Sequence, residues 1–268
     1  MSQTQFSNKA NAADLIKYLN SKHRFNGVKA FSKYTRLSSV IEMFKSRYLL
    51  INNPANMNDL YEYNSFPVKK NWEKICFSSF ITQSTESMAM WSMYAQPWND
   101  GVMISIPIDS MWALVDNTHF LYEAKLNEKT KRYCATTNKI SADSILSFGR
   151  IVYFDGGVLN CTENDGGNRI ISDPYEIPEL AGYVKDSAWD YEKEARLRVD
   201  LPEEYSSNAI FMKLPDEFLS SITIMSGPRF GGNILTALPI EFRPNVKVIV
   251  SKYKEKLAWI PCDDCEHK

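Results

Sequence analysis

The residues best suited to chemistry lie in a short stretch, residues 189–197, where charged and apolar side chains alternate. Glu192, Glu194 and Arg196 occupy every second position there. On a β-strand, side chains two residues apart point to the same face, so a strand would gather two carboxylates and a guanidinium. A helix would scatter these groups around its axis. The alternation therefore predicts a strand with one charged face.

A second group of candidates follows the first expected strand, residues 28–34. Lys33, Tyr34 and Arg36 lie at the end of this strand and directly before an expected helix. Groups at such a junction can bind an anion together with the N-terminus of the helix. Arg36 also has an ordinary explanation as a surface charge.

Three further clusters combine polar and aromatic side chains. Asn58 lies in a polar loop, Ser78 lies within an apolar strand, and Trp91 and Tyr94 have helical spacing. Each has a structural explanation: Asn58 as a turn or helix cap, Ser78 as a small strand residue, and the two aromatics as core. It is the order of the clusters along the chain that favours a functional interpretation.

Many short elements must position these clusters, and we expect one mixed α+β domain of many short strands with flanking helices. Residues 1–27 are expected to form an N-terminal helix and lead-in, residues 28–260 the domain, and residues 261–268 a polar tail. Hydrophobic periodicity predicts helices at residues 12–24, 38–45, 84–94 and 110–115, and strands at residues 28–34, 48–51, 75–81, 101–106, 222–225 and 246–251.

Charge and hydropathy exclude several classes of protein. The 268 residues include 31 Lys and Arg against 32 Asp and Glu, so the chain is no general polyanion binder, and nucleic acid would need a local basic patch. The basic concentration lies in residues 123–150, either as a solvated helix-and-loop surface or as a polyanion contact. No apolar run is long enough to cross a bilayer and the N-terminus is polar, so we expect a cytoplasmic protein without membrane contact.

Five scattered cysteines fit a reducing compartment better than a disulfide framework. One half of a zinc site could come from Cys262, Cys265 and His267, which have suitable spacing. The simpler interpretation is that these residues belong to a solvated polar tail. We therefore expect no metal. The glycine-rich residues 226–232 lack the Lys-Ser/Thr pair of a P-loop and are a weak candidate for a phosphate loop.

The ordered motifs resemble a bacterial family, domain-of-unknown-function family 2971. The motifs are Lys-Tyr-x-Arg, Asn-Asp, Cys-Phe-Ser, Met-Trp-Ser-x-Tyr, Gly-Val and Trp-x-x-Glu-x-Glu-x-Arg, between about residues 31 and 227. The sequence departs from the family at three positions. Leu60 replaces the usual Pro, Met93 a common His, and Ala195 a common aromatic residue. Because Met93 stands where the family often has a His, a catalytic His at this position is excluded.

The layout also resembles, more loosely, that of ADP-ribosyltransferases, including toxin–antitoxin and phage-defence enzymes that modify nucleic acid. This resemblance implies a split sheet whose cleft holds NAD as a substrate. The implied partners are NAD, a macromolecular acceptor that is nucleic acid or protein, and an antitoxin.

The same resemblance implies a role for each candidate residue. Glu194 would stabilise the oxocarbenium-like transition state near the ribose hydroxyls, as in glycoside cleavage. Glu192 would orient or deprotonate the acceptor. Arg36, helped by Lys33, would bind the pyrophosphate, and Tyr34, Trp91 or Tyr94 would stack on the nicotinamide ring. Ser78 would bind the ribose or brace Glu194, Asn58 would be a further NAD contact, and Arg196 would keep Glu194 ionised.

Two alternatives remain open. Asp190, Glu192 and Glu194 with Lys193 resemble the cluster of a metal-dependent nuclease, although the spacing is not the usual acid-x-Lys. In a binding module without catalysis, the same aromatic and acidic residues would form core and ion pairs.

Overall fold

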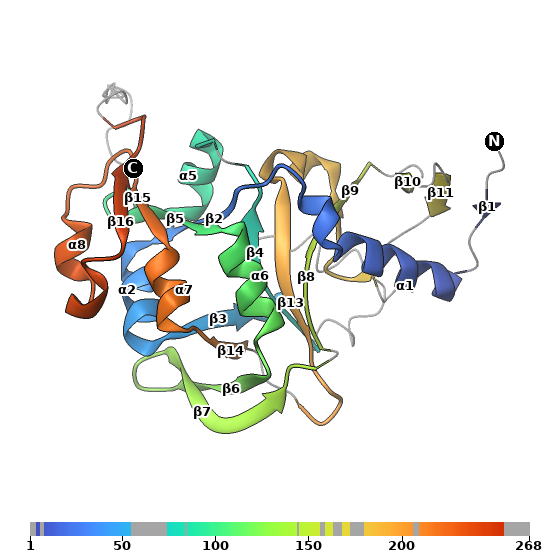
Figure 1. The fold of residues 1–268 in the computed structure, drawn as a ribbon, viewed down its shortest axis with the longest axis horizontal. Coiled ribbons are helices and arrows are strands. Elements are labelled where there is room, and N and C mark those ends of the chain that lie inside the picture. The colour runs from blue at the N-terminus through green and yellow to red at the C-terminus, as the bar shows by residue number, and fades with distance from the viewer. Residues whose placement is uncertain are drawn as a thin grey trace, which may run out of the picture.

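The computed structural model describes residues 4–5, 8–54, 74–83, 85–143, 145–155, 159–162, 168–171, 180–205 and 209–254. Its largest element is an eleven-stranded mixed sheet (Figure 1). The strands are β2 (Ala30–Arg36), β3 (Tyr48–Asn52), β4 (Ile75–Ile81), β5 (Gly101–Pro107), β6 (Phe120–Asn127), β7 (Arg132–Ser141), β8 (Leu146–Arg150), β13 (Glu194–Asp200), β14 (Ala209–Lys213), β15 (Thr223–Ser226) and β16 (Lys247–Val250).

The strands run in the order β16-β15-β5-β2-β4-β3-β14-β6-β7, and β13 pairs with both β4 and β8. Neighbours are antiparallel, except that β15 and β16 are parallel. Two small sheets stand apart. One contains β1 (Thr4–Gln5), β10 (Leu159–Thr162) and β11 (Asn168–Ile171), and the other contains β9 (Val152–Phe154) and β12 (Val184–Asp186).

Short helices cover the sheet, which confirms the expected α+β class. Within the described residues, every helix is too short or too polar to cross a bilayer. The α-helices are α1 (Asn8–Leu19), α2 (Leu37–Ser46), α5 (Met88–Tyr94), α6 (Ile108–Asp116), α7 (Asp216–Ser221) and α8 (Ile234–Ala237), and the 3-10 helices are η1 (Lys22–Phe25), η5 (Ser187–Glu192) and η6 (Ile240–Phe242).

The main core lies between the sheet and helices α2, α6 and α7, which are drawn in front of it in Figure 1. Aromatic rings from distant segments meet there. Phe25 stacks on Phe148 with ring centroids 5.5 Å apart, and Phe31 meets Phe148 edge-on at 4.8 Å. Such pairs add about 0.5–1.5 kcal/mol beyond the burial of their area. Phe25 precedes the expected domain boundary at residue 28, so the lead-in contributes directly to this core.

The sheet divides at β4. Along one edge, β4 pairs with β13 over its whole length, from Ile75 to Ile81. On the other edge, β2 pairs with β4 only through Ser32 and Ile81, and β3 pairs with it only through Asn52 and Phe77. Between these contacts the two neighbouring strands separate. We call this gap beside residues 78–80 the fork.

The structure corrects the expectation of a helix-and-loop surface at residues 123–150. β6 and β7 instead form a long hairpin, followed by β8. The turn is closed by Asn127, whose side-chain oxygen accepts hydrogen bonds from the backbone N–H groups of Lys129 and Thr130. An Asn at this place is a typical turn residue. The charged sequence did not indicate strands, because β6 from Lys125 onward is exposed and every residue of β7 except Ile140 is exposed or half-buried.

The structure also corrects the strand expected at residues 189–192. These residues form the end of the 3-10 helix η5, and the strand begins only at Glu194. Asp186 caps η5 by accepting a hydrogen bond of 2.8 Å from the N–H of Ala188. Lys193 then adopts a left-handed backbone with φ 47°, which redirects the chain into β13. Glu192 and Glu194 therefore do not share a strand face.

Candidate functional site

A cavity of about 620 Å³ lies at the fork, which is within the usual range of roughly 300–1,000 Å³ for small-molecule sites. Its walls come from β2, α2, β3, β4, α5, η5, β13 and the tip of the β6–β7 hairpin. The cavity brings together seven of the residues singled out from the sequence, namely Lys33, Tyr34, Ser78, Tyr94, Glu192, Glu194 and Arg196.

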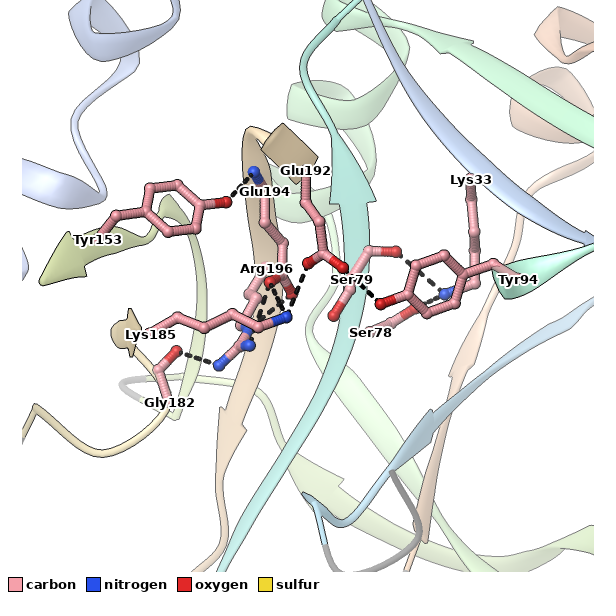
Figure 2. A network of polar contacts seen from close by, with 10 residues as sticks. All are labelled: Lys33, Ser78, Ser79, Tyr94, Tyr153, Gly182, Lys185, Glu192, Glu194 and Arg196. Atoms are coloured by element: carbon pink, nitrogen blue, oxygen red, sulfur yellow. Dashed lines mark hydrogen bonds and ion pairs between the residues drawn. The ribbon is translucent and has the colours of Figure 1, made fainter. Parts of the chain in front are cut away.

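Two buried carboxylates form one wall of the cavity (Figure 2). Glu192 and Glu194 are each only 4% exposed. Lys185 joins them, with its Nζ 2.7 Å from Oε2 of Glu192 and 3.5 Å from Oε2 of Glu194. Burial alone would lower the pKa of Lys185, but the Glu194 and Glu192 charges outweigh it and raise that pKa. The lysine therefore stays charged, as buried carboxylates require.

Arg196 holds Glu194 in a two-point contact. Its Nε and Nη2 donate hydrogen bonds to Oε1 and Oε2 of Glu194 at 2.7 and 3.1 Å. Its Nη1 donates to the carbonyl of Gly182 at 2.9 Å, and its guanidinium lies 4.0 Å from the centre of the Phe77 ring. The predicted alternation is thus correct for this pair: Glu194 and Arg196 share one face, while Ala195 lies in the main core.

The charge state of Glu194 follows from these contacts. Burial alone would raise the pKa of Glu194, but the charges of Arg196 and Lys185 and the Arg196 hydrogen bonds lower it to about 2. The carboxylate is therefore ionised at neutral pH. A group with so low a pKa is a weak proton acceptor and is better suited to stabilising positive charge.

Two tyrosines fix the positions of the acidic residues (Figure 2). The hydroxyl of Tyr94 donates a hydrogen bond of 2.5 Å to Oε1 of Glu192. Burial and this carboxylate raise the pKa of Tyr94, so the phenol keeps its proton. The hydroxyl of Tyr153 accepts a hydrogen bond of 2.8 Å from the backbone N–H of Glu194. Side chains from α5 and β9 thus hold the junction of η5 and β13.

Lys33 lies at the fork, across β4 from the acidic wall. Its Nζ donates hydrogen bonds to Oγ of Ser78 at 3.1 Å and to the carbonyl of Ser79 at 3.0 Å. Among the described residues, no carboxylate oxygen lies within 4.0 Å of it. Burial lowers the pKa of Lys33 to about 8, and the distant charge of Glu194 only partly offsets this. An anionic ligand would supply the partner that this ammonium lacks.

Arg36 and Trp91 do not line the cavity. Trp91 is fully buried, donates from Nε1 to Glu86 at 3.1 Å and meets the Tyr34 ring edge-on at 4.7 Å. Arg36 is exposed, and its Nε donates to the carbonyl of Gln96. These residues of the motifs anchor α5 and the chain that follows it, and α5 in turn presents Tyr94 to the cavity.

Other candidates are placed elsewhere. Asn58, Cys262, Cys265 and His267 lie outside the described residues. Within the described part of the chain, no three His, Cys, Asp or Glu side chains gather as a metal site would need. Asp190, part of the nuclease alternative, pairs with Lys193 at the surface.

Sequence reasoning missed Lys185 and Trp189 as cavity residues. Trp189 lines the cavity, and Nζ of Lys185 lies 4.5 Å from its ring centre. Lys185 is on β12, outside the acidic motif, and reaches it because β12 pairs with β9. The sequence held one indication of this role. Lys185 follows Tyr183 and Val184 in a segment apolar enough to be buried, and a buried lysine needs a carboxylate partner.

The fold and site together describe an α+β protein with a divided sheet and, at the division, a cavity that holds buried charged side chains. Residues 90–197 match a family model described as "Protein of unknown function (DUF2971)". The match runs from α5 to the Glu194–Arg196 pair, so it covers the acidic wall of the cavity and supports the family resemblance. No curated protein and no solved structure matches the chain.

Proposed function

We propose that the cavity binds NAD and that the protein transfers ADP-ribose from it to a macromolecule. One observation supports this proposal above the others. A single cavity contains an ionised, buried Glu194 beside Glu192 on one wall and the ammonium of Lys33 across β4. NAD carries a glycosidic bond that cleaves through a positively charged state and a pyrophosphate that needs a cation, so it requires both features.

The proposed reaction breaks the bond between the ribose C1′ and the nicotinamide nitrogen. The electron pair of this bond leaves with nicotinamide, and C1′ develops positive charge. The carboxylate of Glu194 stabilises that charge because it is already ionised and held in place. The acceptor then bonds to C1′ and gives its proton to Glu192, whose position is set by Tyr94 and Lys185.

Binding of NAD would use the remaining cavity residues. Lys33 and Ser78 would contact the pyrophosphate, so that Lys33 keeps the role expected from the sequence, while Arg36, which does not line the cavity, loses it. Trp189 and Tyr94 line the cavity near the acidic pair and offer aromatic surface to the nicotinamide ring, whose positive charge favours such contact.

The direct test is release of nicotinamide from NAD by the wild-type protein. Glu194→Gln should reduce the rate at least about 100-fold, the usual effect of removing a charge that stabilises a transition state. This variant leaves Arg196 without its counterion, so its folding must be checked by circular dichroism.

Lys33→Met provides a second variant that does not depend on a buried ion pair. It removes an ammonium without a carboxylate partner among the described residues, so the fold should persist while the affinity for NAD falls about tenfold or more, a loss typical of a charged hydrogen bond. Absence of release by folded wild-type protein, with both nucleic acid and protein offered as acceptors, would refute transfer. Unchanged NAD affinity in Lys33→Met would refute the binding mode.

A non-catalytic NAD-binding module is the second candidate. The observation that favours it is the internal pairing of both acids, because Arg196 occupies both oxygens of Glu194 and Lys185 and Tyr94 hold Glu192. In that case NAD should stabilise the protein, by about 2.7 kcal/mol at a concentration 100 times Kd, without being cleaved.

A further inference from the structure

The β6–β7 hairpin concentrates positive charge in a chain whose formal net charge is −1. Residues 120–141 contain five Lys and Arg but only two Glu. Lys125, Lys129 and Lys139 are exposed, and none has a carboxylate within 4.0 Å among the residues that the structure describes. These lysines are therefore free to contact an anionic partner.

The other two cations of the hairpin are paired only weakly. Lys131 lies 2.8 Å from Glu128, and Arg132 lies 3.5 Å from Glu42 on α2. All four side chains are well over half exposed, and surface pairs of this kind contribute about 0–1 kcal/mol. A phosphate could displace either carboxylate at little cost.

Aromatic side chains lie beside this charge. Phe120 and Tyr122 alternate along β6 and so share a face, and Lys139 on β7 is directly opposite Tyr122. The Nζ of Lys139 lies 5.4 Å from the ring centre of Phe120, which is 52% exposed. Tyr133 belongs to the same face, because it pairs with Leu126 on β6 and, like Tyr122, packs against the cluster of Ala124, Ala209 and Phe211. Lys139 therefore lies among aromatic rings on one side of the hairpin.

The same side of the hairpin leads to the cavity. Lys131, Arg132 and Tyr133 at the hairpin tip line it. Lys131 has a left-handed backbone with φ 53°, a conformation that Gly or Asn adopts more cheaply, by about 1 kcal/mol. The turn thus holds a lysine at the mouth of the cavity in spite of a conformational cost.

We propose that this side of the hairpin binds single-stranded nucleic acid and leads it to the cavity. The phosphates would contact the lysines, while unpaired bases would stack on Phe120, Tyr122 and Tyr133. An acidic protein would use the charge but would leave the exposed ring of Phe120 without a partner. β7 has 10 residues and spans about 33 Å, enough for several nucleotides of an extended single strand. The inference rests on the proposed function only in naming this strand as the acceptor.

The test is direct binding, measured without NAD by fluorescence anisotropy. The probes are labelled single strands of DNA and RNA of about 12 nucleotides and the same DNA as a duplex, between about 50 and 200 mM salt. Phe120→Ala should weaken single-strand binding about tenfold or more, because stacking contributes about 1–3 kcal/mol per base. Lys129→Gln with Lys139→Gln should weaken it too and lower the salt slope by about 1.

A matched control changes the same charge at the other end of the sheet. Lys247 and Lys254 are exposed on and after β16, which is the strand farthest from β7 in the sheet order. Lys247→Gln with Lys254→Gln should keep wild-type affinity. Phe120 and the four lysines are exposed, so none of these variants should unfold.

Three results would overturn the inference: no binding of either single strand at low salt, equal losses in the hairpin and control variants, or duplex binding that exceeds single-strand binding and ignores Phe120→Ala. Transfer of ADP-ribose only to acidic proteins would also count against it. Because binding is measured without NAD, failure of NAD turnover leaves this result intact. Loss of strand binding likewise leaves nicotinamide release to be judged separately.

Discussion

At the residue scale, the cavity contains two kinds of charge. Glu194 is ionised and held by Arg196 and Lys185, whereas Lys33 donates to the neutral oxygens of Ser78 and Ser79 and has no carboxylate within 4.0 Å among the described residues. The first arrangement keeps the Glu194 carboxylate ionised, and the second suits binding of an anion. The two can be separated by their dependence on pH.

Lys33 should make ligand affinity depend on pH. Because its pKa in the free protein is about 8, the affinity for ADP-ribose should be constant below pH 8 and fall above it, by up to about tenfold per pH unit. Lys33→Arg should remove this fall, since a guanidinium keeps its proton throughout. Isothermal titration calorimetry across this range measures the effect. A wild-type affinity that does not change above pH 8 would show that Lys33 does not bind the anion.

The charge of Lys185 should offset the repulsion between the buried carboxylates of Glu192 and Glu194 and so stabilise the fold. Lys185→Met leaves Glu192 and Glu194 side by side and should cost about 3–5 kcal/mol near pH 7, whereas Lys185→Arg should cost much less. The pKa of Glu194 is lowered from 4.5 to about 2, so its contribution to wild-type stability is present above pH 4.5 and is lost as the pH falls toward 2. The gap between wild type and Lys185→Met should therefore shrink in acid.

Urea unfolding near neutral pH and near pH 4 would measure both effects. An equal loss in the Met and Arg variants, with no change in acid, would indicate that packing rather than charge is responsible.

Part of this chemistry could be read from the sequence. The alternation at residues 194–196 placed Glu194 and Arg196 on one face, because strand geometry alone decides it. Lys185 could not be found in that way, because its approach depends on the pairing of β12 with β9. Trp91 was ambiguous for the opposite reason: an aromatic at helical spacing lies as readily in a core as in a cavity, and only tertiary contacts decide.

At the element scale, glycine at residue 227 has a packing role and not a phosphate-binding one. Its N–H donates to the carbonyl of Gly101 at 2.9 Å, and an added Cβ would lie 2.6 Å from that oxygen and 3.2 Å from the Trp91 ring. The glycine-rich turn after β15 thus lets the chain pass closely over the start of β5. This explains the turn without a phosphate.

Gly227→Ala should therefore destabilise the protein by about 1–3 kcal/mol through overpacking. Gly231→Ala, in the same turn, should have little effect because an added Cβ would meet nothing within 4 Å. Urea unfolding of both variants would test this. Equal losses would mean that the turn needs glycine for flexibility and not for space.

The elements differed in how well the sequence defined them. β4 was predicted with its correct bounds, because residues 75–81 form an apolar run suited to a strand with neighbours on both sides. The β6–β7 hairpin was missed because its outer residues face solvent on both sides and show no alternation. The division of the sheet beside β4 depends on which distant strands pair, and local patterns do not contain that information.

At the scale of the whole molecule, the divided sheet still shares one core. That core includes Phe31, Ile104 and Ile224 from the β2–β5–β15 half, and Ile51 and Met212 from the β3–β14 half. Neither half therefore buries its apolar face alone.

The protein should unfold in one cooperative step. Unfolding curves in urea followed by tryptophan fluorescence and by far-ultraviolet circular dichroism should coincide, because both halves lose the same core together. Separate transitions would show that the fork divides the molecule into units that fold independently.

The alternation on β13 also protects the fold from mispairing. Ala195, Leu197 and Val199 lie in the main core, while Glu194, Arg196 and Arg198 lie between them. A slip of β13 by one residue against β4 would drive three ionic groups into hydrocarbon and separate Glu194 from Lys185. The side chains proposed to carry the chemistry thus also select the correct register of β13 during folding. A chain with β13 in a shifted register could not form the main core.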